Sequence, residues 1–227
     1  MKTIAIIGAG PGLGLSLAKK FGEKGFRVAV ISRNPKKLAI IVNELKKLNI
    51  EAKSYVADVR DLPALKQALD AVKQDFGHID VLEFSPYAGP THFKHVLETT
   101  AEDVLEQVKG YLLPAVLSVN EVIPDMINNA SGAILLTTGI SAMVSYPSVG
   151  NVGMVMSGVR NYATNLHFEL KEKGIYVGHL SIGTVIQAGT AGDPDLIAEA
   201  WYNFMRKRIA LKILSHKRLT QPNCQTK

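Results

Sequence analysis

The sequence predicts an α/β fold, in which a doubly wound sheet of six or seven parallel strands carries helices on both faces. Short runs rich in valine, isoleucine and leucine alternate with longer segments whose apolar residues recur every three or four positions. Most of these runs are apolar throughout, as expected for strands that helices cover on both sides. A glycine-rich turn, Gly8-Ala9-Gly10-Pro11-Gly12-Leu13-Gly14, joins the first run directly to the first helical segment.

Turn residues separate the expected elements along the chain. Strands are expected at residues 2–7, 26–31, 51–56, 79–84, 132–138 and 175–181, with a weaker seventh strand at 209–214. Helices are expected at residues 15–21, 35–47, 61–76, 100–128, 150–171 and 193–208, the fourth bent near Pro114 and Pro124. Residues 1–214 are therefore expected to form one domain, followed by a flexible tail at residues 215–227.

Composition limits the possible classes of protein. The chain has 227 residues, of which 47% are hydrophobic and 20% charged, as in an ordinary globular domain. No apolar run approaches the roughly 20 residues that a membrane span needs. We expect no signal peptide, because the chain begins with a strand. The only cysteine, Cys224, lies in the tail, so we expect no disulfide and a cytoplasmic location.

Basic residues outnumber acidic ones, with 26 lysines and arginines against 20 aspartates and glutamates. They are scattered, apart from a local excess in residues 206–218. An anionic partner is one interpretation of this excess, but a solvated helix end is simpler, so we expect no nucleic-acid partner. His92 and His95 lack further ligands at the spacing of a metal site, and no metal is expected.

The glycines of the first turn indicate a nucleotide site. Gly8 allows a sharp turn away from the strand, and Gly14 allows the helix to pack closely against it. Gly12 leaves backbone N–H groups open to a pyrophosphate, which the dipole of the following helix also attracts. Pro11 and Leu13 complete the expected phosphate-binding turn. The alternative is a glycine-rich turn that has no ligand.

The end of the second strand indicates which dinucleotide would bind. An acidic residue there would accept a hydrogen bond from the adenosine ribose and favour NAD(H). This chain instead has Ser32 and Arg33, whose hydroxyl and planar cation suit a 2′-phosphate. The expected cofactor is therefore NADP(H) rather than NAD(H). In the alternative interpretation, Arg33 stacks on the adenine or points into solvent.

Asp58 and Val59 follow the third expected strand, beside the place of the adenine. Asp58 has two interpretations: it accepts a hydrogen bond from the adenine amino group, or it caps the next helix. The nearby sequence Asp61-Leu62-Pro63 is itself typical of a helix start.

Over nearly its whole length, the chain resembles the short-chain dehydrogenase/reductase family. Four motifs carry the resemblance: Gly8-x-x-x-Gly12-x-Gly14, Asp58-Val59, Ile79-Asp80-Val81-Leu82, and Phe168-Glu169-Leu170 followed by Gly174-Ile175-Tyr176-Val177.

The resemblance implies a Rossmann-type sheet and hydride transfer between a nicotinamide cofactor and a small carbonyl or alcohol. It also implies cofactor contacts from Ser85, after the fourth strand, and from Gly183 and Val185, after the sixth. Ile182 replaces the proline that the family has at the start of this last loop.

The chain departs from the family at the positions that handle the proton. The resemblance places Gln107, Ile140, Val152 and Met156 where the family has asparagine, serine, tyrosine and lysine. No Tyr-x-x-x-Lys occurs anywhere in the chain. Valine and methionine have no titratable proton, and a positioned general acid contributes about 10²–10⁴-fold in rate. A reaction of this kind therefore needs a substitute donor.

Three tyrosines are the main candidates for that donor. Tyr87 follows the fourth strand, Tyr111 lies one helical turn after the family's asparagine position, and Tyr146 lies in the loop after the fifth strand. His92 and His95 follow the same strand as Tyr87. Arg160, one turn after the lysine position, carries charge but supplies no proton. The alternative for each side chain is a purely structural role.

Two classes of function follow from this pattern. One is an NADP(H)-dependent oxidoreductase with an atypical donor, which the glycine turn and Arg33 favour. The other is a catalytically inactive protein that binds NADP(H) or serves as a scaffold, which the joint loss of four positions favours. In the family, the helix expected at 150–171 forms a subunit interface, so the resemblance implies a homodimer or homotetramer. The sequence does not specify the small-molecule substrate.

Overall fold

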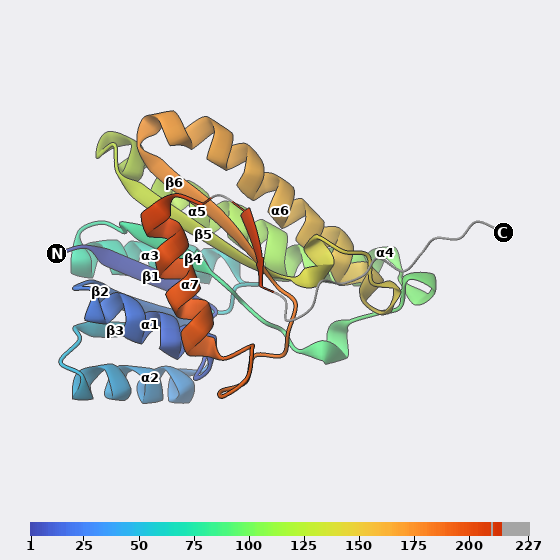
Figure 1. The fold of residues 1–227 in the computed structure, drawn as a ribbon, viewed down its shortest axis with the longest axis horizontal. Helices are drawn as coiled ribbons and strands as arrows, with labels where there is room; N and C mark the ends of the chain where they lie inside the picture. The colour runs from blue at the N-terminus through green and yellow to red at the C-terminus, as the bar shows by residue number, and fades with distance from the viewer. Residues whose placement is uncertain (210, 215–227) are drawn as a thin grey trace.

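The computed structural model describes residues 1–209 and 211–214, and within them it has one parallel sheet of seven strands in the order β3-β2-β1-β4-β5-β6-β7 (Figure 1). The α/β doubly wound fold predicted from the sequence is confirmed. The predicted tail at 215–227, with Cys224, lies outside the described residues. The strands are β1 (Thr3–Ile7), β2 (Arg27–Ser32), β3 (Ala52–Val56), β4 (Val81–Phe84), β5 (Gly132–Gly139), β6 (Ile175–Ile182) and β7 (Leu211–Leu214).

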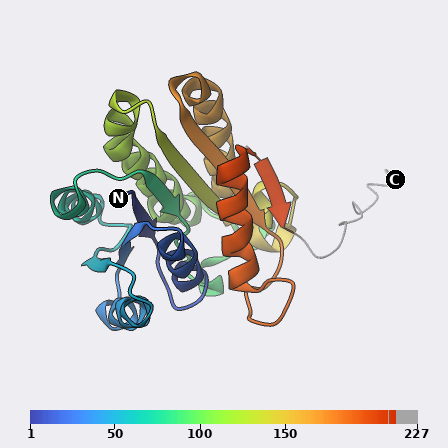
Figure 2. The ribbon, with the colours of Figure 1, turned by 60° about the vertical axis from the view of Figure 1, so that its left-hand side comes forward.

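Helices cover both faces of the sheet (Figures 1 and 2). One face packs against α1 (Leu13–Glu23), α2 (Pro35–Lys47) and α7 (Pro194–Lys207). The other face packs against α3 (Leu62–Phe76), α5 (Leu113–Asn128) and α6 (Gly150–Leu170). Because successive side chains of a strand point to opposite faces, every residue of β1 is buried in one layer or the other. This explains why most residues of the predicted central strands are apolar.

Asn34 and Asp61 fix the starts of two helices beside the sheet edge. The Asn34 side chain accepts a hydrogen bond from Lys37 N at 3.1 Å, and that of Asp61 accepts one from Ala64 N at 3.0 Å. A proline follows each cap within the first turn, where its missing N–H has no cost. Asp61 is therefore the cap of α3, and the capping alternative for Asp58 is wrong.

The helix expected at 100–128 is interrupted. It begins as α4 (Ala101–Gln107), passes through a π-helical turn, η3 (Val108–Leu112), and continues as α5. Pro114 lies just after the interruption, where an uninterrupted α-helix would lose a hydrogen bond and bring its ring against the carbonyl four residues back. The π turn accommodates this proline, whereas Pro124 lies inside α5.

Gly14 offers a test of the predicted close packing between helix and strand. A Cβ at Gly14 would lie 2.7 Å from Ala9 Cα, whereas a Cβ at Gly10 would meet no atom within 4 Å. We expect Gly14→Ala to lower the free energy of unfolding by about 1–3 kcal/mol, the usual cost of overpacking. Gly10→Ala is the control and should change it by less than about 0.5 kcal/mol. Urea unfolding of both variants measures the difference, and equal stabilities would contradict this account of Gly14.

Candidate functional site

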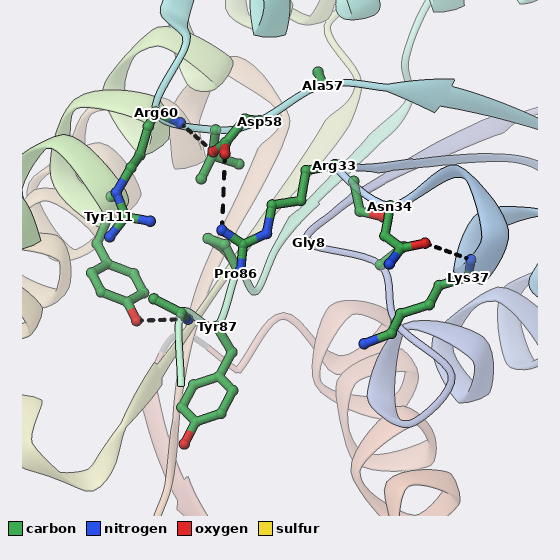
Figure 3. A pocket seen from close by; sticks show the side chains of 16 residues that line it. Gly8, Arg33, Asn34, Lys37, Ala57, Asp58, Arg60, Pro86, Tyr87 and Tyr111 are labelled. Carbon is green, nitrogen blue, oxygen red and sulfur yellow. Dashed lines mark hydrogen bonds and ion pairs between the residues drawn. The ribbon is translucent and has the colours of Figure 1, made fainter. Parts of the chain in front are cut away.

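A crevice of about 270 Å³ lies at the carboxyl ends of the strands on the β3 side of the sheet (Figure 3). Five segments that are distant in sequence meet there. They are residues 8–10 after β1, 32–34 and 37 at the end of β2 and the start of α2, 57–60 after β3, 86–88 after β4 and 110–111 in the π turn. The carboxyl edge of a parallel sheet is where this fold class binds its ligands.

Gly8 makes the crevice possible by bringing two loops close together. Its φ is +89°, and a Cβ there would lie 2.5 Å from Pro86 Cα. The N–H groups of Gly8 and Ala9 both donate to Ile31 O, at 2.9 and 3.1 Å, which fixes the turn against β2. The turn after β1 and the exit of β4 therefore meet without an intervening side chain.

Three cations surround the crevice. Arg33 Nη1 lies 3.9 Å from Asp58 Oδ2, and both side chains are partly exposed (Figure 3). Lys37 lies in the first turn of α2, and its side chain also lines the crevice. Arg60 N donates to Asp58 Oδ1 at 3.0 Å, and its guanidinium lies beside Gly110. With Asp58 as the only carboxylate among the lining residues, the crevice favours an anion.

Sequence reasoning missed Lys37 and Arg60. The signal for Lys37 was the Asn34-Pro35 helix start, because a capped helix fixes where its first turn points. Arg60 had no comparable signal, since its position depends on the distant Gly110. A Cβ at Gly110 would lie 3.3 Å from Arg60 Nη2, so a larger residue there would displace the guanidinium.

Two of the three candidate tyrosines line the crevice. Tyr111 is 2% exposed, and its hydroxyl accepts a hydrogen bond from Ala88 N at 3.2 Å (Figure 3). Burial raises the pKa of Tyr111 above its ordinary value, so the hydroxyl keeps its proton at neutral pH. Tyr87 is 68% exposed and lies edge-on to Phe93. Tyr146, at the start of η5 (Pro147–Val149), is not among the lining residues.

The four positions expected to handle the proton carry no acid. Val152 and Met156 are buried in an apolar cluster with Tyr111, Ala142 and Val155. Ile140 begins the short helix η4 (Ile140–Ala142). Gln107 is 1% exposed, and its amide donates to His92 O at 3.1 Å instead of reaching the crevice. Of the residues near the helix interruption, Tyr111 reaches the crevice and Gln107 does not.

Asn151 holds the segment 86–99 against the start of α6. Its buried side chain accepts a hydrogen bond from Lys94 N at 2.9 Å and donates one to His92 O at 2.9 Å. Gly150 N donates to Lys94 O at 2.8 Å, and a Cβ at Gly150 would lie 2.6 Å from Val96 Cα. The segment therefore lies directly on the helix that carries Val152 and Met156.

A cluster of buried polar side chains on β5 and β6 lies beneath α6. The hydroxyl of Thr138 lies 2.9 Å from His179 Nε2 and 3.0 Å from Ser181 Oγ. Burial, together with the positive charge of Arg160, lowers the pKa of His179 to about 4, so the imidazole is neutral. Arg160 was expected to carry charge into the site, but it contacts Ala142 O at 3.5 Å.

The remaining predicted cofactor contacts fall in two regions. Pro11, Gly12, Leu13 and Gly14 form the start of α1, where a Cβ at Gly12 would meet no atom within 4 Å. The connection from β6 to α7 contains Gly183 and Val185, the latter 77% exposed, and folds back through Gln187 N to Gly192 O at 3.0 Å. Ser85 directly follows β4, and its N–H donates to Ile7 O at 3.0 Å. Their contacts with a cofactor stay predictions.

Residues 1–209 and 211–214 contain no group of three or more histidine, cysteine, aspartate or glutamate side chains placed to hold a metal ion. In the same part of the chain, no helix combines the length and the apolar character that a membrane crossing requires.

Comparison with known proteins identifies the family. The family model for short chain dehydrogenases matches residues 2–192. The chain belongs to the short-chain dehydrogenase family. This confirms the resemblance seen in the sequence, and the family supports a generic oxidoreductase that uses a nicotinamide cofactor.

Individual family members resemble the chain over most of its length. A 3-oxoacyl-[acyl-carrier-protein] reductase, FabG, from Staphylococcus aureus is 25% identical over 199 residues, which are 87% of this chain and 80% of the relative. A short-chain dehydrogenase from Rhodopseudomonas palustris superimposes with a TM-score of 0.83 at 24% identity, covering 95% of this chain and 99% of the other. An actinorhodin polyketide ketoreductase variant with NADPH gives a TM-score of 0.76 at 23% identity, covering 91% and 79%.

Asn151 offers a test of how the segment 86–99 is held. Asn151→Ala leaves Lys94 N and His92 O with fewer partners, which we expect to cost about 1–3 kcal/mol of stability. It should also expose residues 86–99 to limited proteolysis. Asn165→Ala is the matched control on the same helix, because Asn165 is exposed and its hydrogen bonds go only to Asn161. Equal cleavage rates in the two variants would refute the role given to Asn151.

Proposed function

We propose that this short-chain dehydrogenase binds NADP(H) and transfers a hydride between the nicotinamide and a small carbonyl or alcohol, slowly and without the usual proton donor. The observation that carries the proposal is the cationic crevice beside the glycine turn. Arg33 and Lys37 lie where the adenosine ribose of a dinucleotide would be, at the end of β2. The assignment to the cytoplasm stays an expectation.

The residues present fit a dinucleotide. The open space at Gly10 and Gly12 lets backbone N–H groups approach a pyrophosphate, and a side chain at either position would fill this space. Ser32, Arg33 and Lys37 would hold the 2′-phosphate by charge-assisted hydrogen bonds. Arg33 exchanges its exposed contact with Asp58 for this phosphate at little cost, because exposed ion pairs contribute only about 0–1 kcal/mol. Asp58 then becomes available to the adenine amino group.

When bound, the cofactor supplies the hydride. Tyr111 is the side chain best placed to donate a hydrogen bond to a substrate oxygen. Its hydroxyl accepts from Ala88 N, which leaves the phenolic proton free to be donated. In the family, a lysine lowers the pKa of the tyrosine, whereas burial raises the pKa of Tyr111. Tyr111 therefore polarises a carbonyl but transfers its proton poorly, and turnover is expected to be slow.

An NADP(H)-binding protein without turnover is the second candidate function. The buried apolar cluster around Val152, Val155 and Met156 favours it, because the one titratable side chain in that cluster, Tyr111, has a pKa that burial raises and no neighbouring lysine to lower it. The side-chain amides of Asn151 and Gln107 both donate to His92 O and so hold the segment 86–99 in place over this cluster. The two candidates share the cofactor and differ only in turnover.

We also propose a homodimer or homotetramer, as the family resemblance implies. Large apolar side chains are exposed on the outer helices, at Met154 and Phe168 of α6, at Leu105 of α4 and at Leu113 of α5. Self-association would bury them.

Arg33 provides the test of cofactor choice. We expect Arg33→Ala to weaken NADPH binding by about 10–100-fold, the effect of losing a charge-assisted hydrogen bond of about 1.5–3 kcal/mol. NADH lacks the 2′-phosphate, so its affinity should change little. Lys36→Ala is the matched control, because Lys36 neighbours Lys37 in sequence but does not line the crevice. Calorimetric titrations decide the question, and an equal loss for both cofactors would count against the 2′-phosphate site.

Tyr111 provides the test that separates the two candidate functions. NADPH oxidation by the natural chain should be measured with aldehydes, ketones and quinones. If hydride transfer occurs, Tyr111→Phe should lower its rate by about 10-fold or more while NADPH binding is kept. Tyr87→Phe is the control, as an exposed crevice tyrosine. NADPH binding with background rates for every substrate would favour the second candidate.

A further inference from the structure

A carboxyl group, that of Glu83, is buried in the middle of the sheet just below the candidate site. Glu83 lies on β4, one residue before the strand ends, and is 0% exposed. Thr137 Oγ1 lies 2.9 Å from its Oε1, and Ser85 Oγ lies 2.9 Å from its Oε2, both at hydrogen-bond distance. Both hydroxyl groups come from the carboxyl ends of their strands, and both residues are partly exposed. The mechanism described above uses none of these groups.

No charge compensates Glu83 among the side chains that the structure describes. On the neighbouring strands its partners in register are Ile6 and Leu135, and α7 contributes the indole of Trp201, which donates to Thr137 Oγ1 at 2.9 Å. On the helices that cover this face, Lys20 of α1 and Glu199 of α7 form an ion pair with each other. A carboxylate without a cation in such a place is costly, so Glu83 is protonated.

The hydrogen bonds indicate where the proton lies. An indole N–H only donates, so Thr137 Oγ1 accepts from Trp201 and gives its own proton to Glu83 Oε1. The proton of the neutral carboxyl therefore lies on Oε2, in the contact with Ser85 Oγ. Burial raises the pKa of Glu83 to about 8, in agreement with a protonated group at neutral pH.

The position of Glu83 relates it to one half of a dinucleotide. The crevice places the adenosine over the ends of β2 and β3, and the glycine turn follows β1. A dinucleotide that continues across the sheet brings its nicotinamide half to the ends of β4 and β5, which carry Ser85 and Thr137. Glu83 shares the sheet face of α1, since Val81 and Leu135 beside it pack in the same layer as Leu17.

The nicotinamide is cationic when oxidised and neutral when reduced, and a nearby cation favours the ionised form of a carboxyl group. We propose that Glu83 sets the preference of this site between oxidised and reduced cofactor. The inference rests on the proposed NADP(H) site. Glu83 keeps its proton in the free protein and with NADPH, and loses it through Ser85 to solvent when NADP⁺ binds. Alkaline conditions therefore favour NADP⁺ binding, and acidic conditions favour NADPH binding.

Proton release on binding is the direct test. NADP⁺ and NADPH are titrated calorimetrically into the natural chain between pH 6.5 and 8.5, in two buffers with different ionisation enthalpies. If the pKa of Glu83 falls by about one unit from about 8 when NADP⁺ binds, NADP⁺ should release about 0.4 proton more than NADPH at pH 7. Its affinity relative to NADPH should rise about sixfold over this range. NADPH carries the same 2′-phosphate as NADP⁺. Protons that this phosphate takes up or releases on binding are therefore equal for the two cofactors and cancel in the difference.

Glu83→Gln is the matched variant, because the amide keeps both hydrogen-bond positions but cannot ionise. It should bind NADPH normally and show no difference in proton release between the two cofactors. Trp201, the only tryptophan, reports the network without a cofactor. Its emission should titrate with a midpoint near pH 8 in the natural chain and stay constant in Glu83→Gln.

The outcomes separate the two proposals. If neither cofactor binds, the proposed function fails. If both bind and the natural chain releases equal numbers of protons with each, the role of Glu83 is refuted while the proposed function stands. Should Glu83→Gln fail to fold, the buffer comparison and the Trp201 titration of the natural chain still decide the question.

Discussion

The contact between the turn after β1 and the exit of β4 is the constraint on which the site depends. Gly8 can adopt its φ of +89° and let Pro86 approach, because it has no Cβ to clash there. This contact fixes the edge of the crevice, and the hydrogen bonds to Ile31 O tie it to β2 and so to Arg33. On the other side of the crevice, the π turn brings Tyr111 to Ala88. Backbone geometry, more than any one side chain, thus brings cations and a hydroxyl to the same strand ends.

The two halves of the site differ in kind. At the β2–β3 half, the three cations Arg33, Lys37 and Arg60 line the crevice with a single carboxylate, so this half has an excess of positive charge that an anion can neutralise. At the α6 half, Val152 and Met156 are packed against apolar neighbours, and the nearby amides of Gln107 and Asn151 bond to backbone groups. Binding and proton transfer are separate properties of a fold, because the residues that provide them lie on different elements. Arg33 and Asp58, which are expected to bind the cofactor, line the crevice, whereas Val152 and Met156, at two positions expected to handle the proton, have apolar side chains.

The sequence predicted those parts of the structure that depend on local pattern. The strands, the glycine turn and Arg33 follow from periodicity and from one strand end, and these predictions place Arg33 in the crevice as observed. It could not predict which residue of the interrupted helix faces the site. A π turn adds a residue to one helical turn and rotates everything after it, so Tyr111 reaches the crevice and Gln107 does not. Arg60 and Asn151 depend on contacts with Gly110 and Lys94, which are distant in sequence and leave no local signal.

Glu83 is hard to explain by stability alone. Its pKa is raised from the ordinary 4.5 to about 8, so the folded chain holds a proton that the unfolded chain releases over this range. The free energy of unfolding therefore decreases as the pH rises from 4.5 towards 8. An apolar residue would avoid this loss, as Val81 does two residues earlier on the same strand face. A buried acid that weakens the fold at neutral pH, yet is bonded to hydroxyls at the ends of β4 and β5, is more readily explained by what binds there than by the packing around it.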